Sequence, residues 1–158
     1  GAAPFYELFA SSDHSQLNVV EKASTLATAI KIGNPVSWKK ALRALEWTDG
    51  VVERVSEQEI ADAKAIIGRD GIGCEPASAA TLAGIKRLVA ARVMAADSDI
   101  VAVLTGNLLK DPNYTVDYHT GKLGVVAGEE RLAINGRFAN RPLRVSTNKN
   151  EIKRLLGL

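Results

Sequence analysis

A chain of 158 residues, 46% hydrophobic and 24% charged, has the length and composition of one globular domain with a hydrophobic core. With 20 basic and 18 acidic residues its net charge is only +2, which argues against nucleic acid or an anionic membrane surface as a partner. No apolar run approaches the roughly 20 residues that span a bilayer. The single cysteine, Cys74, excludes an internal disulfide and a Cys-rich metal site, and with no signal-like segment a cytoplasmic location is expected.

The first half of the chain predicts three helices. Residues 21–30 predict a short helix that the turn at Gly33-Asn34-Pro35 ends. Residues 37–46 predict a second helix with Ser37 as its N-cap. The third covers residues 57–68, where Ser56 and Glu59 have the spacing of a capping box.

Short apolar runs alternate with these helices further along the chain. Residues 51–55, 71–76 and 100–104 predict strands, and residues 77–94 predict a long helix that begins with small side chains. Helices of ten or more residues between short strands are typical of βαβ units. The predicted fold class is therefore α/β, with a parallel sheet of βαβ units flanked by helices.

The last third of the chain has a weaker pattern. Residues 114–126 and 131–136 predict irregular structure with a possible hairpin, and residues 142–146 predict a terminal strand. A helix capped by Asn148 is expected to close the chain. With no repeat and no low-complexity linker, residues 1–158 are interpreted as a single unit.

Thr105 is the first candidate site residue, because it follows directly on the apolar run 100–104. In an open parallel sheet, ligands bind beyond the carboxyl ends of the strands. A threonine hydroxyl there offers one uncharged hydrogen bond, and Gly106 allows a close backbone approach. Taken alone, such a Thr-Gly pair is more often an ordinary turn, just as Gly33 alone could be a helix C-cap and Glu75 a solvated carboxylate.

Three motifs taken together are more specific. "TAIKIGNPVSWKKAL", "VSEQEIADAKAIIGRDGIGCEPASAATLAGI" and "VAVLTGNLLKDP" occur in this order, and the chain ends in "EIKRLLGL". In this order and spacing they closely resemble threonine synthase, a branch of the fold-type-II pyridoxal 5'-phosphate enzymes. The resemblance implies the C-terminal part of the large domain of such an enzyme.

The resemblance also implies roles for individual residues. Thr105 occupies the position of the family's threonine that reaches the pyridine nitrogen of pyridoxal phosphate, and an uncharged hydroxyl there makes the ring a weaker electron sink than a carboxylate would. Gly33 and Asn34 match a loop near the cofactor ring. Glu75 matches a segment that borders the cofactor. The resemblance assigns no catalytic residue and no metal ligand to this chain.

The sequence departs from the family in one important respect. Threonine synthases carry their Schiff-base lysine in a Ser-x-Lys-Asp-type motif, and neither this motif nor a phosphate-binding loop rich in glycine and asparagine occurs here. The N-terminal part of the enzyme would then have to supply both. A single neutral hydrogen bond contributes about 0.5–1.5 kcal/mol, so the chain alone is expected to bind the cofactor poorly and to be inactive.

Three functions follow as alternatives. The first is the C-terminal part of a threonine synthase, which makes threonine and phosphate from O-phosphohomoserine and water and is expected to be a homodimer when complete. The second is part of a serine or threonine dehydratase-like enzyme, since those enzymes share the "EPA" motif in looser form. The third is a non-catalytic remnant of the fold, which the absent lysine motif would also predict.

Overall fold

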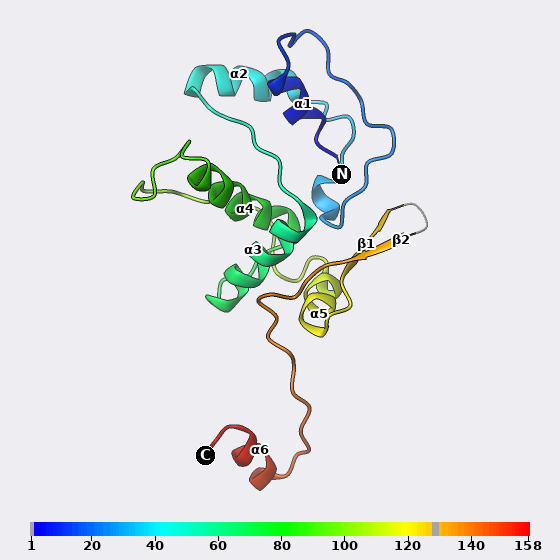
Figure 1. Ribbon diagram of the computed structural model, residues 1–158, viewed down its shortest axis with the longest axis vertical. Coiled ribbons are helices and arrows are strands. Elements are labelled where there is room, and N and C mark those ends of the chain that lie inside the picture. The colour runs from blue at the N-terminus through cyan, green and yellow to red at the C-terminus, as the bar shows by residue number, and fades with distance from the viewer. Residues whose placement is uncertain (1, 128–129) are drawn as a thin grey trace.

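The computed structural model describes residues 2–127 and 130–158 of the chain, and Figure 1 shows a main body with a separate C-terminal arm. None of its described helices is long and apolar enough to cross a membrane. In chain order the elements are α1 (Pro4–Ala10), the 3-10 turn η1 (Thr28–Ile30), α2 (Trp38–Thr48), α3 (Glu57–Arg69), α4 (Pro76–Ala90), α5 (Pro112–Thr120), β1 (Gly124–Ala127), β2 (Glu130–Ala133) and α6 (Lys149–Leu155).

Helix α3 begins where the capping box predicted it. The Ser56 N–H donates to Glu59 Oε2 at 2.7 Å, and the Glu59 N–H donates to Ser56 Oγ at 3.2 Å. These two bonds satisfy N–H groups that the first helical turn leaves without an intrahelical acceptor. The predicted helix is confirmed.

Helix α4 packs against α3 and contributes Ala79 and Ala83 to the hydrophobic core. Pro76 starts α4 at a position where a missing N–H costs nothing. Ala61 on α3 and Ala79 and Ala83 on α4 are almost fully buried, so the two backbones approach closely. The helix ends at Ala90, earlier than predicted, because the chain turns at Arg92, whose φ is 58°.

The predicted parallel sheet is not present among the described residues. Residues 51–55, 71–75 and 100–104 carry no strand hydrogen bonding, and the sheet that the structure does contain is the antiparallel pair β1 and β2. Val101 is 92% and Val103 is 65% exposed. A strand is stable only beside a hydrogen-bonded neighbour, and these runs have none here. The chain is therefore α/β in content, and the predicted pairing of parallel strands is not confirmed by the described residues.

Two other predictions in the first part of the chain are corrected. Only the turn η1 forms within residues 21–30. The backbone N–H groups of Leu26 and Ala27 donate instead to the side chains of Glu57 and Thr25, which compete with a helix. Ser37 does precede α2, but its side chain makes no capping hydrogen bond.

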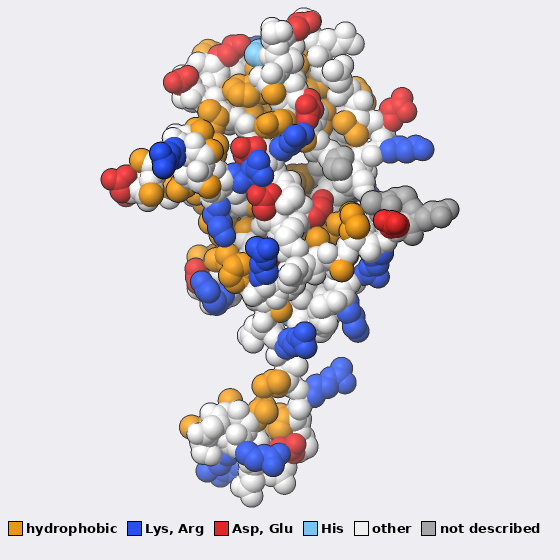
Figure 2. Space-filling model, viewed as in Figure 1, with side chains coloured by type: hydrophobic (Ala, Val, Ile, Leu, Met, Phe, Trp, Pro, Cys, Tyr) orange, Lys and Arg blue, Asp and Glu red, His pale blue; other side chains and the backbone are white. Residues whose placement is uncertain are grey.

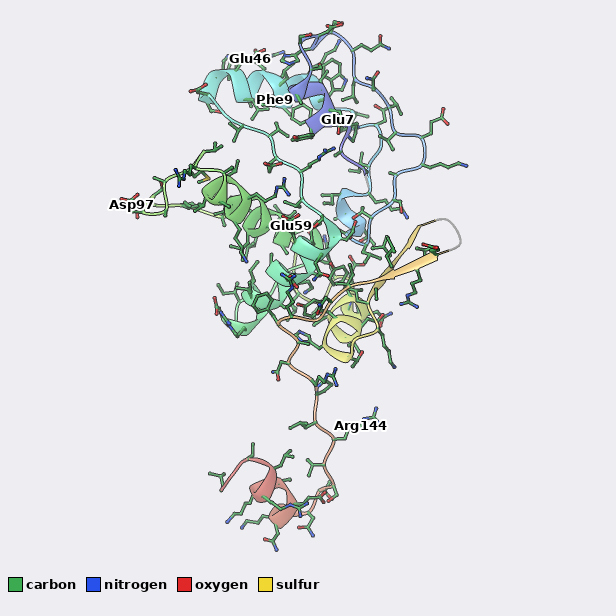
Figure 3. All side chains as sticks on the ribbon, in the orientation of Figure 1. Glu7, Phe9, Glu46, Glu59, Asp97 and Arg144 are labelled. Atoms are coloured by element: carbon green, nitrogen blue, oxygen red, sulfur yellow. The ribbon has the colours of Figure 1, made fainter. Side chains whose placement is uncertain are left out.

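The C-terminal third is partly as expected. The hairpin forms as β1 and β2, and Asn148 Oδ1 accepts from the Asn150 N–H at 2.9 Å to cap α6. Helix α5 was not predicted, and residues 142–146 form no strand. They are exposed and lead to α6, which lies away from the body (Figure 1); Arg144 lies on this arm in Figure 3.

Candidate functional site

Thr105 lies against the N-terminal end of α4. Its Oγ1 is 3.0 Å from Ser78 Oγ, and the next backbone N–H, that of Gly106, donates to the same Ser78 oxygen at 3.0 Å. The Glu75 N–H donates to the Gly106 carbonyl at 3.1 Å. These bonds join the end of the 100–104 segment to the first turn of α4. Two of the predicted site residues, Thr105 and Glu75, are therefore neighbours.

The Glu75 carboxylate is the charged group of this cluster. Its side chain is only 4% exposed, and its Oε2 is 3.3 Å from Lys110 Nζ, in an ion pair that is not aligned as a hydrogen bond. Thr105 Oγ1 donates toward Glu75 Oε1 at 3.5 Å, which is the outer limit of a hydrogen bond. A buried carboxylate needs such compensation, and Lys110 supplies it from the surface.

Gly106 is required at its position because of this carboxylate. A Cβ at residue 106 would overlap the Glu75 side chain. The backbone can lie against Glu75 only when residue 106 has no side chain. The sequence predicted a close approach at Gly106, and the group it approaches in this structure is Glu75.

The other two predicted residues lie elsewhere. A Cβ at Gly33 would overlap the carbonyl oxygen of Val20, and the Val20 N–H donates to the Gly33 carbonyl at 3.0 Å. Asn34 is exposed. No hydrogen bond of the described residues joins Gly33 or Asn34 to the cluster of Thr105, Ser78 and Glu75.

Sequence reasoning did not select two members of the cluster. Ser78 was only part of the small-residue start of a helix, although it stands three residues after Glu75, one turn further along the same helical face. Lys110 belongs to a Lys-Asp-Pro run that is typical of a surface turn, and it is indeed exposed. No local signal pairs it with Glu75.

A buried lysine fixes the segment that leads into α4. Lys64 is 5% exposed, and its Nζ donates to the Cys74 carbonyl at 2.7 Å. Burial lowers the pKa of Lys64, against the opposing effect of Cys74 and Asp111, and burial raises the pKa of the Cys74 thiol. This contact ties α3 to the residue before Glu75, so it holds the cluster in place.

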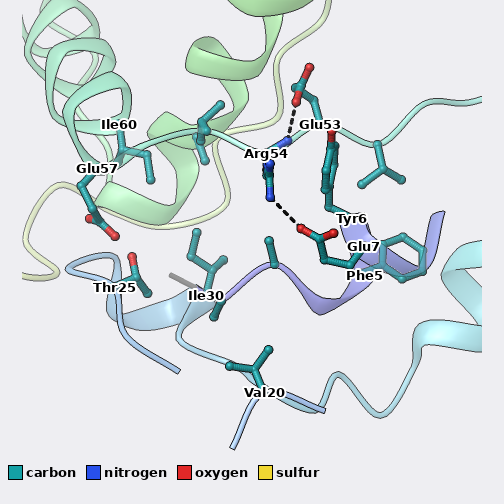
Figure 4. A pocket seen from close by; sticks show the side chains of 15 residues that line it. Phe5, Tyr6, Glu7, Val20, Thr25, Ile30, Glu53, Arg54, Glu57 and Ile60 are labelled. Atoms are coloured by element: carbon teal, nitrogen blue, oxygen red, sulfur yellow. Dashed lines mark hydrogen bonds and ion pairs between the residues drawn. The ribbon is translucent and has the colours of Figure 1, made fainter. Parts of the chain in front are cut away.

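A cavity of about 520 Å³ lies apart from this cluster, between α1, η1 and the start of α3 (Figure 4). Its lining includes Tyr6, Ile30 and Ile60, and Arg54 pairs with Glu7 at 2.6 Å beside it. Thr105 and Glu75 are not among its lining residues. In Figure 2 hydrophobic side chains are spread over the whole visible face, and some of them lie on this upper part of the molecule.

The chemistry that the cluster offers is hydrogen bonding. Thr105 is exposed, uncharged and held by a buried serine, so its hydroxyl can meet a flat ligand with a ring nitrogen. Lys110, the amine of the cluster, is engaged with Glu75. The cluster can therefore orient a ligand.

Comparisons with known proteins agree on one family. A family model described as "Pyridoxal-phosphate dependent enzyme" matches residues 1–106. The threonine synthase of Methanosarcina acetivorans is 47% identical over 98 residues, which are 61% of this chain and 24% of that protein. The threonine synthase of Methanocaldococcus jannaschii is 33% identical over 157 residues, 99% of this chain and 34% of that protein. The chain thus spans about a quarter to a third of these relatives.

Proposed function

Since the chain belongs to the family of pyridoxal-phosphate dependent enzymes, we propose that it is the C-terminal part of a threonine synthase. The complete enzyme would convert O-phosphohomoserine and water to threonine and phosphate, by γ-elimination followed by β-addition of water. The observation that carries the proposal is Thr105, an exposed hydroxyl fixed by Ser78 beside the buried carboxylate of Glu75.

The geometry of the cluster fits the cofactor. Pyridoxal phosphate, when bound, supplies the conjugated ring that withdraws electrons from the substrate. Thr105 would hold the ring by its pyridine nitrogen through an uncharged hydrogen bond, and Glu75 would border it. The charge of Glu75 is already compensated by Lys110, so the ring nitrogen would meet a neutral donor.

Gly33 and Asn34 belong to the same proposal as residues of a loop near the ring. Asn34 is exposed, so its amide is free to face a ligand. Among the described residues no hydrogen bond joins this loop to Thr105, and we propose that the N-terminal part of the enzyme brings the two together around the ring. That part would also supply the lysine and the phosphate-binding loop.

The same N-terminal part would complete the parallel sheet. Val101 and Val103 are exposed apolar residues in an extended run, which is the state of a strand without its neighbours. We propose that residues 51–55, 71–75 and 100–104 pair as strands in the complete enzyme. A homodimer and a cytoplasmic location are further parts of the proposal.

The test is a chimera with the Methanocaldococcus jannaschii threonine synthase. Residues 1–158 would replace the matching segment of that protein, which the alignment covers over 157 residues. We expect the chimera to bind pyridoxal phosphate and to form threonine from O-phosphohomoserine. Thr105→Val, which keeps the volume and removes the hydroxyl, should weaken cofactor binding about two- to tenfold. Thr105→Ser should restore most of it.

The alternatives give different results in the same experiment. A chimera that deaminates serine or threonine and makes no threonine from O-phosphohomoserine would indicate a dehydratase. A folded chimera that binds no cofactor would contradict the proposal and indicate a non-catalytic remnant. Borohydride reduction of residues 1–158 with pyridoxal phosphate, followed by peptide mapping, serves as a control: one lysine labelled in full would mean that this chain carries its own attachment site.

A further inference from the structure

The hydroxyl of Ser78 lies between two groups that differ in hydrogen-bonding character. The Gly106 N–H can only donate, and it reaches Ser78 Oγ at 3.0 Å. Thr105 Oγ1, which can donate or accept, is also 3.0 Å from Ser78 Oγ. Ser78 is 3% exposed, so bulk water does not compete for its proton. Gly106 takes one of the two acceptor sites of Ser78 Oγ, and among the described residues Thr105 Oγ1 is the one hydrogen-bond partner of Ser78 that can accept its proton.

This direction determines what Thr105 does with its own proton. When Thr105 Oγ1 accepts from Ser78, the Thr105 proton points to Glu75 Oε1 or away from the protein. The contact with Glu75 is long, at 3.5 Å, and Lys110 already neutralises that carboxylate. A ring nitrogen with a free lone pair at ordinary hydrogen-bond distance would be the better acceptor.

We propose that Ser78 is a positioning residue that makes Thr105 a hydrogen-bond donor to the pyridine nitrogen of the cofactor. The inference rests on the proposed function, and it adds a residue whose effect reaches the ring only through Thr105. Ser78 is placed for this by α4: Pro76 starts the helix, and the residue two positions later faces the end of the 100–104 segment.

The test uses the chimera with cofactor labelled with ¹⁵N at the pyridine position. Ser78→Ala leaves the Thr105 hydroxyl free to rotate toward Glu75. We expect the Kd for pyridoxal phosphate to rise, by no more than the roughly two- to tenfold expected for Thr105→Val, since one hydrogen bond to the ring is weakened or lost. We also expect the ¹⁵N chemical shift and the absorbance band of the bound cofactor to move, which a purely structural role of Ser78 would not cause. Ser78→Thr keeps the hydroxyl and should restore the shift.

Two further variants make the result specific. Thr81→Val removes a hydroxyl from the next turn of the same helix and should leave both readouts unchanged. In a Thr105→Val background, Ser78→Ala should add nothing to the loss of affinity, because the group through which it acts is gone. A full additional loss in the double variant would mean that Ser78 acts by another route and would overturn the inference.

The failure of this inference is distinguishable from failure of the proposed function. A chimera that binds no cofactor at all overturns both. A chimera that binds cofactor and makes threonine, but whose Ser78→Ala variant keeps the wild-type Kd and ¹⁵N shift, overturns only the positioning role. If Ser78→Ala alone is too unstable to purify, Ser78→Cys, with a weak donor of similar size, gives the same comparison.

Discussion

The helix pair α3 and α4 and the segment 100–104 are both rich in apolar residues, but only the helix pair buries them. Ile60 and Ala83 in the helix pair are 3% and 2% exposed, whereas Val101 is 92% exposed. Each helix makes its own backbone hydrogen bonds and finds its packing partner nearby in the sequence. A strand needs a neighbour for both purposes. The helix pair therefore folds and packs within this chain, whereas segment 100–104 needs a neighbouring strand to pair with and to cover it.

The largest expected effect comes from breaking the helix pair. Ile60→Ala removes a buried side chain at the contact of α3 with the core, and it should lower the free energy of unfolding by about 2–4 kcal/mol. Urea unfolding followed by circular dichroism measures it. Val103→Ala, at a position that is 65% exposed, is the matched control and should change stability by less than about 0.5 kcal/mol. Equal losses at both positions would contradict the comparison.

The next effect concerns the contact between α3 and α5. Tyr118 OH donates to Asp62 Oδ1 at 2.7 Å and accepts from the Phe138 N–H at 3.2 Å. Tyr118→Phe removes both bonds and should cost about 1–2 kcal/mol. It should also remove a dependence on pH. Burial, with the bond to Asp62 as a smaller contribution, raises the pKa of Tyr118 from 10.0 to about 12.

The sign of this pH dependence follows from the raised pKa. Below pH 10 the phenol is protonated in both states and its contribution is complete. Between pH 10 and 12 the unfolded chain loses the proton while the folded chain keeps it, so stability falls. The wild type should lose stability more steeply than Tyr118→Phe across this range, as measured by unfolding at a series of pH values. Parallel curves would refute the assignment to Tyr118.

The elements that the sequence predicted well are those with local causes. The capping box of Ser56 and Glu59 and the cap at Asn148 each use residues within a few positions of one another. Helix α5 was missed because its polar residues show no apolar stripe, and it is held by Tyr114 and Tyr118 against the core. The strands were predicted from short apolar runs and their spacing between helices. Strand pairing depends on neighbouring strands that are distant in the sequence, which a local pattern does not reveal.

The same distinction applies to the candidate site. Thr105 was selected because it follows an apolar run, and a family resemblance then assigned roles to Thr105 and Glu75; the structure places the two side chains together. Ser78 and Lys110 were not selected, because their roles depend on contacts with residues distant in the sequence, Thr105 and Glu75 respectively. Whether Thr105, Glu75, Gly33 and Asn34 bind the cofactor stays a prediction. For Gly33 and Asn34 this prediction requires the N-terminal part of the enzyme, as does the proposed strand pairing of segment 100–104.

A smaller effect tests the self-sufficient start of α3. Ser56→Ala removes the cap and should lower the free energy of unfolding by about 1 kcal/mol.

Burial opposes ionisation of Glu59, but the hydrogen bonds from Ser56 and Arg87 prevail and lower its pKa below 4.5. A lowered pKa stabilises the fold above pH 4.5, and this contribution is lost as the pH falls through the folded value. Glu59→Gln should therefore flatten the loss of stability in acid, as thermal unfolding from pH 6 to 3 would measure; an unchanged slope would contradict it.

The smallest expected effect is that of Val101→Thr on residues 1–158, and it is informative when the same substitution is also measured in the chimera. Val101→Thr exchanges a methyl group for a hydroxyl at a position that is 92% exposed, so it should change the stability of this chain by less than about 0.5 kcal/mol. In the chimera, where we propose that residues 100–104 pair as a central strand, the same hydroxyl would be buried and should cost about 1–3 kcal/mol. Lys22→Met, at an exposed position in the loop before η1, is the control that should stay neutral in both. A neutral Val101→Thr in a folded chimera would mean that this segment remains uncovered, and that the enzyme is completed around Thr105 in some other way.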